Sequence, residues 1–293
     1  MPDYVTLREE WEGVLGRRRD LGQALSFWTS VLDGWRSWDA ETVTPLPWSG
    51  AECRSRWRRG VPLMAEVEWD IAPEPFEELL GPMMERLAVG GAEDAQALRR
   101  FALAWDAGQV GPESLLPTSG KEGAAVLQGD AGLPATLTSF LAHAGLRPAL
   151  EDLFSSVRDL PDGVWERGVC PWCGGMPGWG DLGEDGRRRL SCHLCGGGWT
   201  APRLRCPFCE TWHSGDMVRL LAQGAEEGYF VEACRSCRGY IKGVDRRQRW
   251  NAGSPLVEDW ASPHLDLYAT REGYWRETPS LVHLLPPEGD AAP

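Results

Sequence analysis

Eight of the nine cysteines in this 293-residue chain stand in four C-x-x-C pairs. The pairs are Cys170/Cys173, Cys192/Cys195, Cys206/Cys209 and Cys234/Cys237. Two thiolates separated by two residues can bind one metal ion from a tight turn, and two such turns complete a tetrahedral site. Gly174 and Gly196 directly follow two of the pairs, and glycine readily takes the positive φ that such a turn needs. The pattern therefore predicts metal binding by all eight thiolates.

The four pairs can be combined in more than one way. Taken in sequence they read C-x2-C-x18-C-x2-C and then C-x2-C-x24-C-x2-C, and the first spacing is typical of a four-cysteine zinc ribbon. A local hairpin closes each loop at a lower entropic cost than a crossed arrangement does, so we expect sequential pairing. The first site would then contain the first two pairs and the second site the last two. A cross-braced pairing, first with third and second with fourth, stays open.

Other uses of these residues fit the pattern less well. Disulfides are rare in a reducing compartment, and a thioredoxin-type dithiol calls for one C-x-x-C at the start of a helix rather than four in Gly-rich hairpins. His193 and His213 lie near the pairs, but eight thiolates already make two complete sets, so we expect both to be ordinary polar histidines. Cys53 stands alone among arginines, and we interpret it as an incidental thiol.

The chemistry of the predicted sites argues against catalysis. A closed tetrahedral set of four sulfurs accepts iron or zinc, and it leaves no vacant position for Lewis-acid chemistry. The sequence also shows no nucleophile beside a base and no phosphate-binding loop. We expect Asp259 and Asp266, which share a face of a predicted helix, to cap a helix or to pair with arginines rather than to act in catalysis. The prediction is two metal ions, iron or zinc, in a protein that is not an enzyme.

The composition and charge of the chain restrict its possible binding partners and its cellular compartment. The formal net charge is −13, whereas nucleic-acid binding needs clustered positive charge, so we expect no nucleic-acid partner. No apolar run reaches the ~18 to 20 residues of a membrane span. Arg17 to Arg19 could suggest an export signal, but the amphipathic segment that follows carries Asp33 and Arg36 and is no short apolar core. We therefore expect a cytoplasmic protein.

The first half of the chain has helical periodicity, and the second half does not. One predicted helix presents on a single face the apolar residues Leu21, Leu25, Trp28, Leu32 and Trp35. Further helices are expected over residues 50–59, 74–89, 93–107, 134–144 and 147–158. After Gly163, short apolar segments between Gly-rich turns predict strands over 188–191, 198–204, 217–221 and 228–232. A last helix is expected over 255–271, with inward-facing Leu256, Trp260, Leu267 and Tyr268.

These elements predict an α+β multidomain fold. Residues 1–163 would form an α-helical domain. Residues 164–254 would form tandem rubredoxin-like or zinc-ribbon four-cysteine modules, with the first site at about 166–203 and the second at about 204–244. Residues 255–285 would supply a C-terminal helix and a tail that pack on the rest, and residues 286–293 a disordered tail.

Taken together and in sequence order, these motifs resemble those of the formate dehydrogenase accessory protein family, FdhE. The resemblance rests on Cys170-Pro171-Trp172-Cys173-Gly174, Leu190-Ser191-Cys192, Cys206-Pro207-Phe208-Cys209, Glu232-Ala233-Cys234 and Tyr240-Ile241-Lys242. It covers roughly residues 165–275, while the N-terminal half agrees only in length and helical character. It implies a helical domain beside a rubredoxin-like region, with iron in the four-cysteine sites. It also implies a cytoplasmic maturation factor that acts on the molybdenum-containing catalytic subunit of formate dehydrogenase before export.

Two further interpretations follow. A rubredoxin-like redox or electron-transfer module is the alternative function, and a ribbon that binds nucleic acid is less favoured. A basic surface on the metal-binding region could meet the partner protein. The candidate residues for that surface are Arg187, Arg188, Arg189, Arg203, Tyr240 and Lys242.

Overall fold

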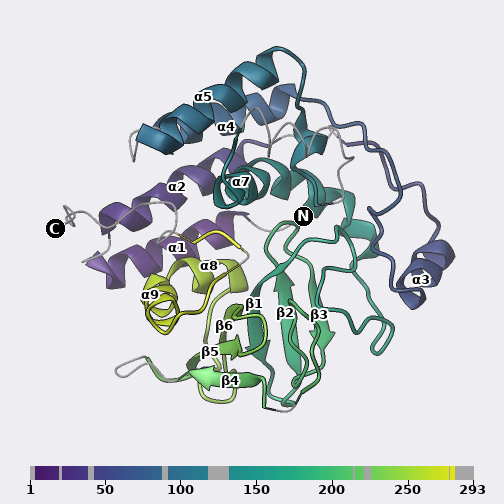
Figure 1. Ribbon diagram of the computed structural model, residues 1–293, viewed down its shortest axis with the longest axis vertical. Helices are drawn as coiled ribbons and strands as arrows, with labels where there is room; N and C mark the ends of the chain where they lie inside the picture. The colour runs from purple at the N-terminus through teal and green to yellow at the C-terminus, as the bar shows by residue number, and fades with distance from the viewer. Residues whose placement is uncertain are drawn as a thin grey trace.

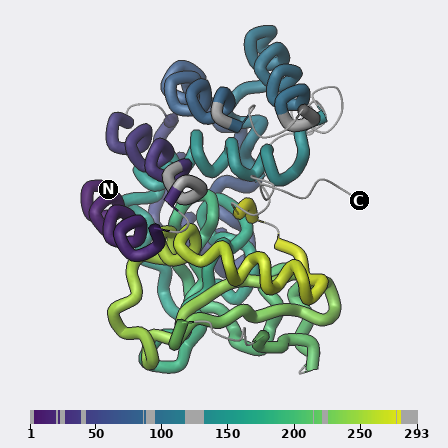
Figure 2. The backbone as a smooth tube through the Cα atoms, turned by 90° about the vertical axis from the view of Figure 1, so that its left-hand side faces the viewer, coloured from purple at the N-terminus to yellow at the C-terminus, as the bar shows by residue number. Residues whose placement is uncertain are grey.

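Helices from the first half of the chain pack over a β-sheet built by the second half (Figure 1). The computed structural model describes residues 4–19, 22–38, 43–87, 92–117, 132–213, 215–220, 226–276 and 278–280. Seen from the side, the helices and the sheet form two layers, with the C-terminal helices between them and along the sheet (Figure 2). This architecture confirms the predicted α+β class, while the predicted tail over 286–293 lies outside the described residues.

The helical layer follows the predicted periodicity with one addition. Its main helices are α1 (Tyr4–Arg17), α2 (Gly22–Arg36), α3 (Gly50–Arg58), α4 (Glu74–Leu87), α5 (Ala92–Asp106) and α7 (Ala135–Leu153). On α2 the predicted face is confirmed at Trp28, Leu32 and Trp35, which are buried, while Leu21 lies outside the described residues. Helix α1 was not predicted because its apolar stripe is narrow: only Trp11 and Val14 are buried along it.

Helix α7 is continuous where the sequence predicted two helices. Pro148 lies inside it and has no N–H to donate to the carbonyl of Ala144 one turn earlier, which normally kinks a helix. Here the indole N–H of Trp35 donates to that carbonyl at 2.7 Å, so the freed acceptor is satisfied within the core. The helix is buried over most of its circumference from Phe140 to Leu150, and it therefore lies at the centre of the layer.

The second half of the chain forms one sheet rather than two separate ribbons. Within the described residues its strands are β1 (Pro177–Leu182), β2 (Arg188–Cys192), β3 (Gly198–Ala201), β4 (Met217–Leu220), β5 (Tyr229–Cys234) and β6 (Tyr240–Val244). They lie in the order β3-β2-β1-β6-β5-β4. We call β1, β2 and β3 the first ribbon and β4, β5 and β6 the second ribbon, so each ribbon contributes three strands. Strands β1 and β6 were not predicted. They are central and buried along their whole length, so they show no alternation of polar and apolar residues.

The two ribbons meet at the β1–β6 pair, which is parallel although the other pairs are antiparallel. Trp179 on β1 lies opposite Lys242 on β6. The backbones approach so closely that a Cβ added at Gly243 would lie 1.7 Å from the carbonyl oxygen of Gly180. Glycine at this position is therefore a condition for joining the ribbons.

The predicted C-terminal helix is divided into α8 (Pro255–Trp260) and α9 (Pro263–Arg271). Pro263 cannot continue a helix from Ser262, because it lacks the N–H and disfavours helical backbone in the residue before it. The break changes which residues face inward. Leu256 and Trp260 are buried as predicted, whereas Leu267 is 42% exposed and Leu265 and Asp266 are buried.

One hydrophobic core joins the helical layer to the first ribbon. It contains Trp11 and Trp28 of the first helices, the cysteines of the first four-cysteine set, and Trp260 of α8. The rings of Trp28 and Trp260 stack with centroids 4.1 Å apart. A smaller core between the sheet and α9 includes Trp179, Val231 and Leu265. Packing is thus continuous across residue 163, where the sequence analysis predicted a boundary.

Across the residues that the structure covers, none of the helices combines the length and the hydropathy that a membrane crossing needs.

Candidate metal centres

The eight paired cysteines form two clusters, each built from two pairs that are consecutive in the sequence. We call them the first centre (Cys170, Cys173, Cys192 and Cys195) and the second centre (Cys206, Cys209, Cys234 and Cys237). In each centre the sulfurs lie within 4.8 Å of one another. The grouping is sequential as expected, and a cross-braced arrangement would have mixed the pairs.

The four C-x-x-C turns share one backbone geometry. In every turn the N–H of the first cysteine donates to the carbonyl five residues later, and that cysteine's own carbonyl accepts from the residue four positions later. The residue after each second cysteine has positive φ, and these residues are Gly174, Gly196, Glu210 and Arg238. The first two are the predicted glycines. In the second centre, side chains occupy the left-handed conformation that glycine takes more readily.

The sulfur positions fit a tetrahedral ion. Sulfurs from different turns are 3.5 Å apart in the first centre and 3.7 and 3.8 Å apart in the second. Metal–sulfur bonds of about 2.3 Å place the sulfurs of a regular tetrahedron about 3.8 Å apart. These separations are far longer than the ~2.0 Å of a disulfide bond. The donor set is therefore suited to iron or zinc, which the geometry does not distinguish.

Burial couples metal loading to proton release. Burial raises the pKa of the Cys170 and Cys173 thiols well above the usual range, and it raises the pKa of Cys237 to about 11. Without a cation these thiols are protonated at neutral pH. A metal ion must displace their protons, so its binding weakens as the pH falls.

The two centres differ in their access to solvent. All four cysteines of the first centre are buried, and three of them have no exposed surface. In the second centre Cys209 is exposed and Cys237 is partly exposed. Trp212 and Trp275 near the second centre are 57% and 43% exposed, and the Trp275 indole donates to the Cys237 carbonyl.

Backbone N–H groups also point at the sulfurs of both centres. Such bonds, 3.4 Å long, run from Gly175 to Cys173, from Cys195 to Cys192, from Phe208 to Cys206 and from Gly239 to Cys237. They stabilise the negative charge that a thiolate carries as a ligand. In the first centre a guanidinium adds to them, because Arg158 Nη1 lies 3.7 Å from Cys195 Sγ.

The predicted partner surface is partly wrong. Arg187, Arg189 and Arg203 are exposed, but Arg188, Tyr240 and Lys242 are buried and cannot meet another protein directly. Their positions explain the error, because Tyr240 and Lys242 lie on the central strand β6 and Arg188 faces the protein interior from β2.

Arg188 has a structural role instead. Its guanidinium donates to the carbonyls of Arg203 and Arg205, both at 3.1 Å, in the segment that leads into the second centre. It also lies 3.6 Å from a carboxylate oxygen of Glu232, two residues before Cys234. Arg188 therefore links the β2 strand of the first ribbon to both halves of the second centre.

Lys242 belongs to a buried charge cluster, which we define as Lys242, Asp259, Asp266 and Arg276. Lys242 Nζ lies 3.0 Å from Asp259 and 2.6 Å from Asp266, and Arg276 contacts the same carboxylates at 2.8 and 3.0 Å. Burial alone would raise the pKa of Asp259, but Arg276 and Lys242 lower it below its usual range. The predicted pairing of the aspartates with arginine is confirmed for Arg276. The cluster has equal numbers of positive and negative groups, as burial requires.

The histidines near the cysteines have different surroundings. His213 is exposed, whereas His193 is packed face to face with His143 at 4.5 Å between ring centroids. His143 Nδ1 lies 2.6 Å from the carbonyl of His193, which can only accept, so Nδ1 carries the proton. Burial lowers the pKa of both rings, that of His193 to about 3. Both histidines are therefore neutral, and neither belongs to a four-cysteine cluster.

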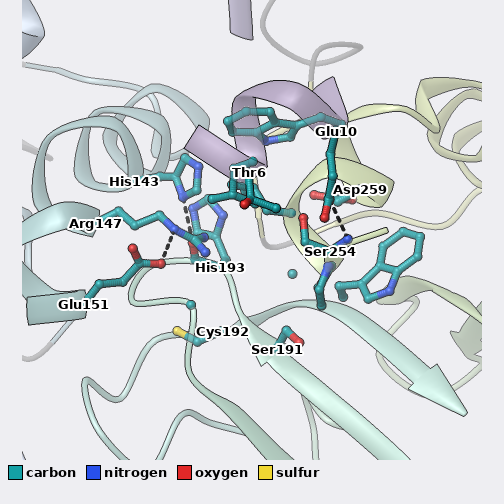
Figure 3. Close-up of a pocket in the computed structure, with 17 residues that line it drawn as sticks. Thr6, Glu10, His143, Arg147, Glu151, Ser191, Cys192, His193, Ser254 and Asp259 are labelled. Atoms are coloured by element: carbon teal, nitrogen blue, oxygen red, sulfur yellow. Dashed lines mark hydrogen bonds and ion pairs between the residues drawn. The ribbon is translucent and has the colours of Figure 1, made fainter. Parts of the chain in front are cut away.

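A cavity of about 370 Å³ lies beside the first centre, where α1, α7, α8 and the β1–β2 ribbon meet (Figure 3). His143, Arg147 and Glu151 line one side, with Arg147 Nε donating to Glu151 at 2.8 Å. Glu10 and Asp259 lie on the other side (Figure 3). The sequence does not predict this cavity, because its walls come from segments far apart in the chain and no local spacing connects them.

Sequence comparison finds curated relatives that are named FdhE or FdhE homologues. No family model matches the chain. A protein from Stutzerimonas stutzeri named "Protein FdhE homolog" is 33% identical over 159 residues, covering 51% of this chain and 50% of that protein. One of the same name from Pseudomonas aeruginosa is 34% identical over 166 residues, covering 54% of this chain and 52% of its own length. The chain thus spans about half the length of the curated relatives it matches.

Structural comparison extends the likeness to nearly the whole chain. The crystal structure of the FdhE protein from Pseudomonas aeruginosa aligns with a TM-score of 0.58 and 26% sequence identity. The alignment covers 96% of this chain and 95% of that one. The helical layer, for which the sequence motifs gave no match, is therefore included in the shared fold. Together, these comparisons show that the chain is similar to several FdhE homologues in sequence over about half of their length, and to an FdhE crystal structure in fold over nearly its whole length.

Proposed function

We propose that this protein is an accessory factor for formate dehydrogenase that binds the catalytic subunit during assembly and holds one metal ion in each four-cysteine centre. The observation that carries the proposal is the combination of two closed, tetrahedrally arranged thiol sets with an FdhE fold along nearly the whole chain. Coordinatively full sites suit structure or electron transfer better than catalysis. We therefore propose a role without enzymatic activity.

The exposed arginines are the part of the predicted docking surface that remains available. Arg187 and Arg189 both contact Asp185 at the β1–β2 turn, and Arg203 follows β3. We propose that this end of the first ribbon meets acidic groups on the catalytic subunit. Electrostatic pairing of that kind favours fast and selective association.

The test is co-purification of the tagged full-length protein with the formate dehydrogenase catalytic subunit of the same organism. We expect one stable complex, weakened when Arg187, Arg189 and Arg203 are together replaced by glutamate. Replacement of Arg54, Arg58 and Arg99, three exposed arginines on α3 and α5, by glutamate is the matched charge control, and it should leave the complex intact. Absence of the catalytic subunit from wild-type preparations would refute the proposal.

A rubredoxin-like electron-transfer role is the second candidate, and the exposed Cys209 of the second centre favours it. An iron tetrathiolate near the surface can exchange single electrons with a partner. Metal analysis and absorbance spectra of protein purified without oxygen would test this role. Iron at the second centre with a reversible change of absorbance on reduction would support it, and zinc alone at both centres would exclude it.

A further inference from the structure

We propose that the two centres release metal by different routes. At the second centre an incoming thiolate ligand attacks the bound ion directly, whereas the first centre releases its ion only after the helical layer separates from the ribbon. The inference rests on the proposed function in one respect, that each centre holds a metal ion. It adds that the first ion is a buried structural ion, whereas the second ion is open to ligand exchange.

The first centre is held shut by the helical layer. The segment after α3 pairs with the first C-x-x-C turn, because the N–H groups of Leu63 and Met64 donate to the carbonyls of Pro171 and Trp172 at 3.1 and 3.0 Å. The indole of Trp57 also donates to the Pro171 carbonyl at 3.0 Å. All four cysteines are buried, and even Cys192, which lines the neighbouring cavity, is only 2% exposed, so these contacts keep an external ligand from the sulfurs.

Arg158 closes the other turn of the first centre. Its Nη2 donates to the carbonyl of Cys195 at 2.7 Å, and its Nη1 lies 3.7 Å from the Cys195 sulfur. The guanidinium packs over the rings of Trp172 and Phe154. Gly197 allows this approach, because a Cβ there would lie 2.4 Å from Arg158 and 2.5 Å from Trp172.

The guanidinium also balances charge. A divalent ion with four thiolates carries two negative charges, and such charge is costly in a buried site without a positive partner. Arg158 therefore acts as a positioning residue that holds the Cys195 turn and favours the loaded, ionised form of the first centre. It makes both contacts from the segment that follows α7, so opening this side requires movement of the helical layer.

Among the residues that the structure describes, none forms an equivalent cover over Cys209 at the second centre. That residue is exposed, Cys237 is partly exposed, and the neighbouring Leu204 and Trp212 are also exposed. An incoming thiolate can bond to the ion while the bond between the ion and Cys209 breaks. The displaced Cys209 sulfur keeps the electron pair of the broken bond as a thiolate, and the ion keeps its oxidation state. No unfolding is needed for this exchange.

The experiment is metal release from the full-length protein loaded with two zinc ions, under anaerobic and reducing conditions. Two competitors are each varied in concentration: the chromophoric chelator 4-(2-pyridylazo)resorcinol and the dithiol 2,3-dimercaptopropanesulfonate. We expect two phases of one zinc each, separated by about tenfold or more, because opening a packed layer costs free energy that a surface exchange does not. The fast rate should rise in proportion to competitor concentration, and the slow rate should not depend on it.

Variants assign the phases. Cys209→Ser should remove or accelerate only the fast phase. Arg158→Met should accelerate the slow phase about tenfold or more and leave the fast phase unchanged, because it removes a charged hydrogen bond to the first centre. Arg158→Lys, which keeps the charge, should have a smaller effect. Arg235→Met, at an exposed position inside the last C-x-x-C turn, is the control and should leave the slow phase unchanged.

Distinct outcomes separate this inference from the function on which it rests. Two zinc ions that leave in a single phase, or a slow phase whose rate rises with competitor concentration, would overturn the inference and leave metal binding intact. Folded protein that retains fewer than two ions would overturn both. Slow-phase rates that are equal in Arg158→Met and wild-type protein would refute the role of Arg158.

Discussion

Nζ of Lys242 lies 2.6 Å from Oδ2 of Asp266, and the side chain of each is only 1% exposed. Lys242 lies on β6 at the position opposite Trp179 of β1, where the two ribbons are joined. Asp266 lies on α9, so the pair connects the sheet junction to the C-terminal helices. A buried pair of this kind stabilises little relative to apolar residues, but the loss of one partner leaves an uncompensated charge.

Replacement of Lys242 by methionine is therefore expected to destabilise the fold. We predict a loss of about 3 to 5 kcal/mol in the free energy of unfolding, because Asp259 and Asp266 would share one remaining cation, Arg276. Denaturant unfolding followed by circular dichroism measures it. Arg189→Met, at a 60% exposed position on the same sheet, should change stability by less than about 0.5 kcal/mol. Equal effects of the two substitutions would contradict the prediction.

Substitution of Gly243 tests the closeness of the ribbons. Gly243→Ala places a Cβ 1.7 Å from the Gly180 carbonyl oxygen, so β1 and β6 must move apart and several neighbouring contacts are lost. We predict a destabilisation of roughly 2 kcal/mol or more from this backbone clash. Gly81 on α4 has no atom within 4 Å of an added Cβ, and Gly81→Ala should stabilise by about 0.5 to 1 kcal/mol. Thermal unfolding of both variants gives the comparison.

The stacked pair Trp28 and Trp260 is expected to be a main contributor to the shared core. Trp260→Ala should cost about 3 to 5 kcal/mol, because it leaves a cavity between α2 and α8. It should also weaken the near-ultraviolet circular dichroism that stacked indoles produce. Trp250 is 79% exposed, and Trp250→Ala should leave stability within about 0.5 kcal/mol of wild type. A Trp260 variant as stable as the Trp250 variant would show that the stack contributes little.

The neutral state of His143 predicts a pH dependence. Burial holds its folded-state pKa well below 6.5, so between that value and pH 6.5 the unfolded chain binds the additional proton. Stability must then fall as the pH is lowered from 6.5, at up to about 1.4 kcal/mol per pH unit for this one group. His143→Asn keeps an N–H donor near the His193 carbonyl and removes the titration. Unfolding free energies from pH 7.5 to 5.5 should therefore fall less steeply for the variant, and parallel curves would disprove the assignment.

The cysteine grouping and most elements of the fold could be predicted because their signals are local. A C-x-x-C turn fixes its own geometry within a few residues, and the helical stripe containing Trp28 and Trp35 follows from a period of 3.6. Sequential pairing could also be predicted from local properties, because a hairpin between consecutive pairs closes its loop at a lower entropic cost than a crossed arrangement does. These features need no knowledge of how distant segments meet.

The errors concern residues whose neighbours are distant in sequence. Tyr240 and Lys242 look like surface residues by type, but they are buried since β1 covers one edge of β6 and Asp266 supplies the partner for the amine. The sequence predicted two helices in place of α7, yet Trp35 supplies the hydrogen bond that Pro148 removes, from more than a hundred residues away. The spacing of residues along the sequence does not show when a distant residue will supply such a hydrogen bond or ion pair. The cavity at His143 was missed for the same reason.

The edge-to-face contact between Trp11 and Trp260, with ring centroids 5.8 Å apart, has a consequence for synthesis on the ribosome. The first helices emerge long before the residue that completes their core. Until about 260 residues have left the exit tunnel, the surfaces of Trp11 and Trp28 that Trp260 covers stay open to chaperones or to aggregation. A nascent chain stalled before α8 should therefore be digested readily by protease, and a chain released after α8 should resist.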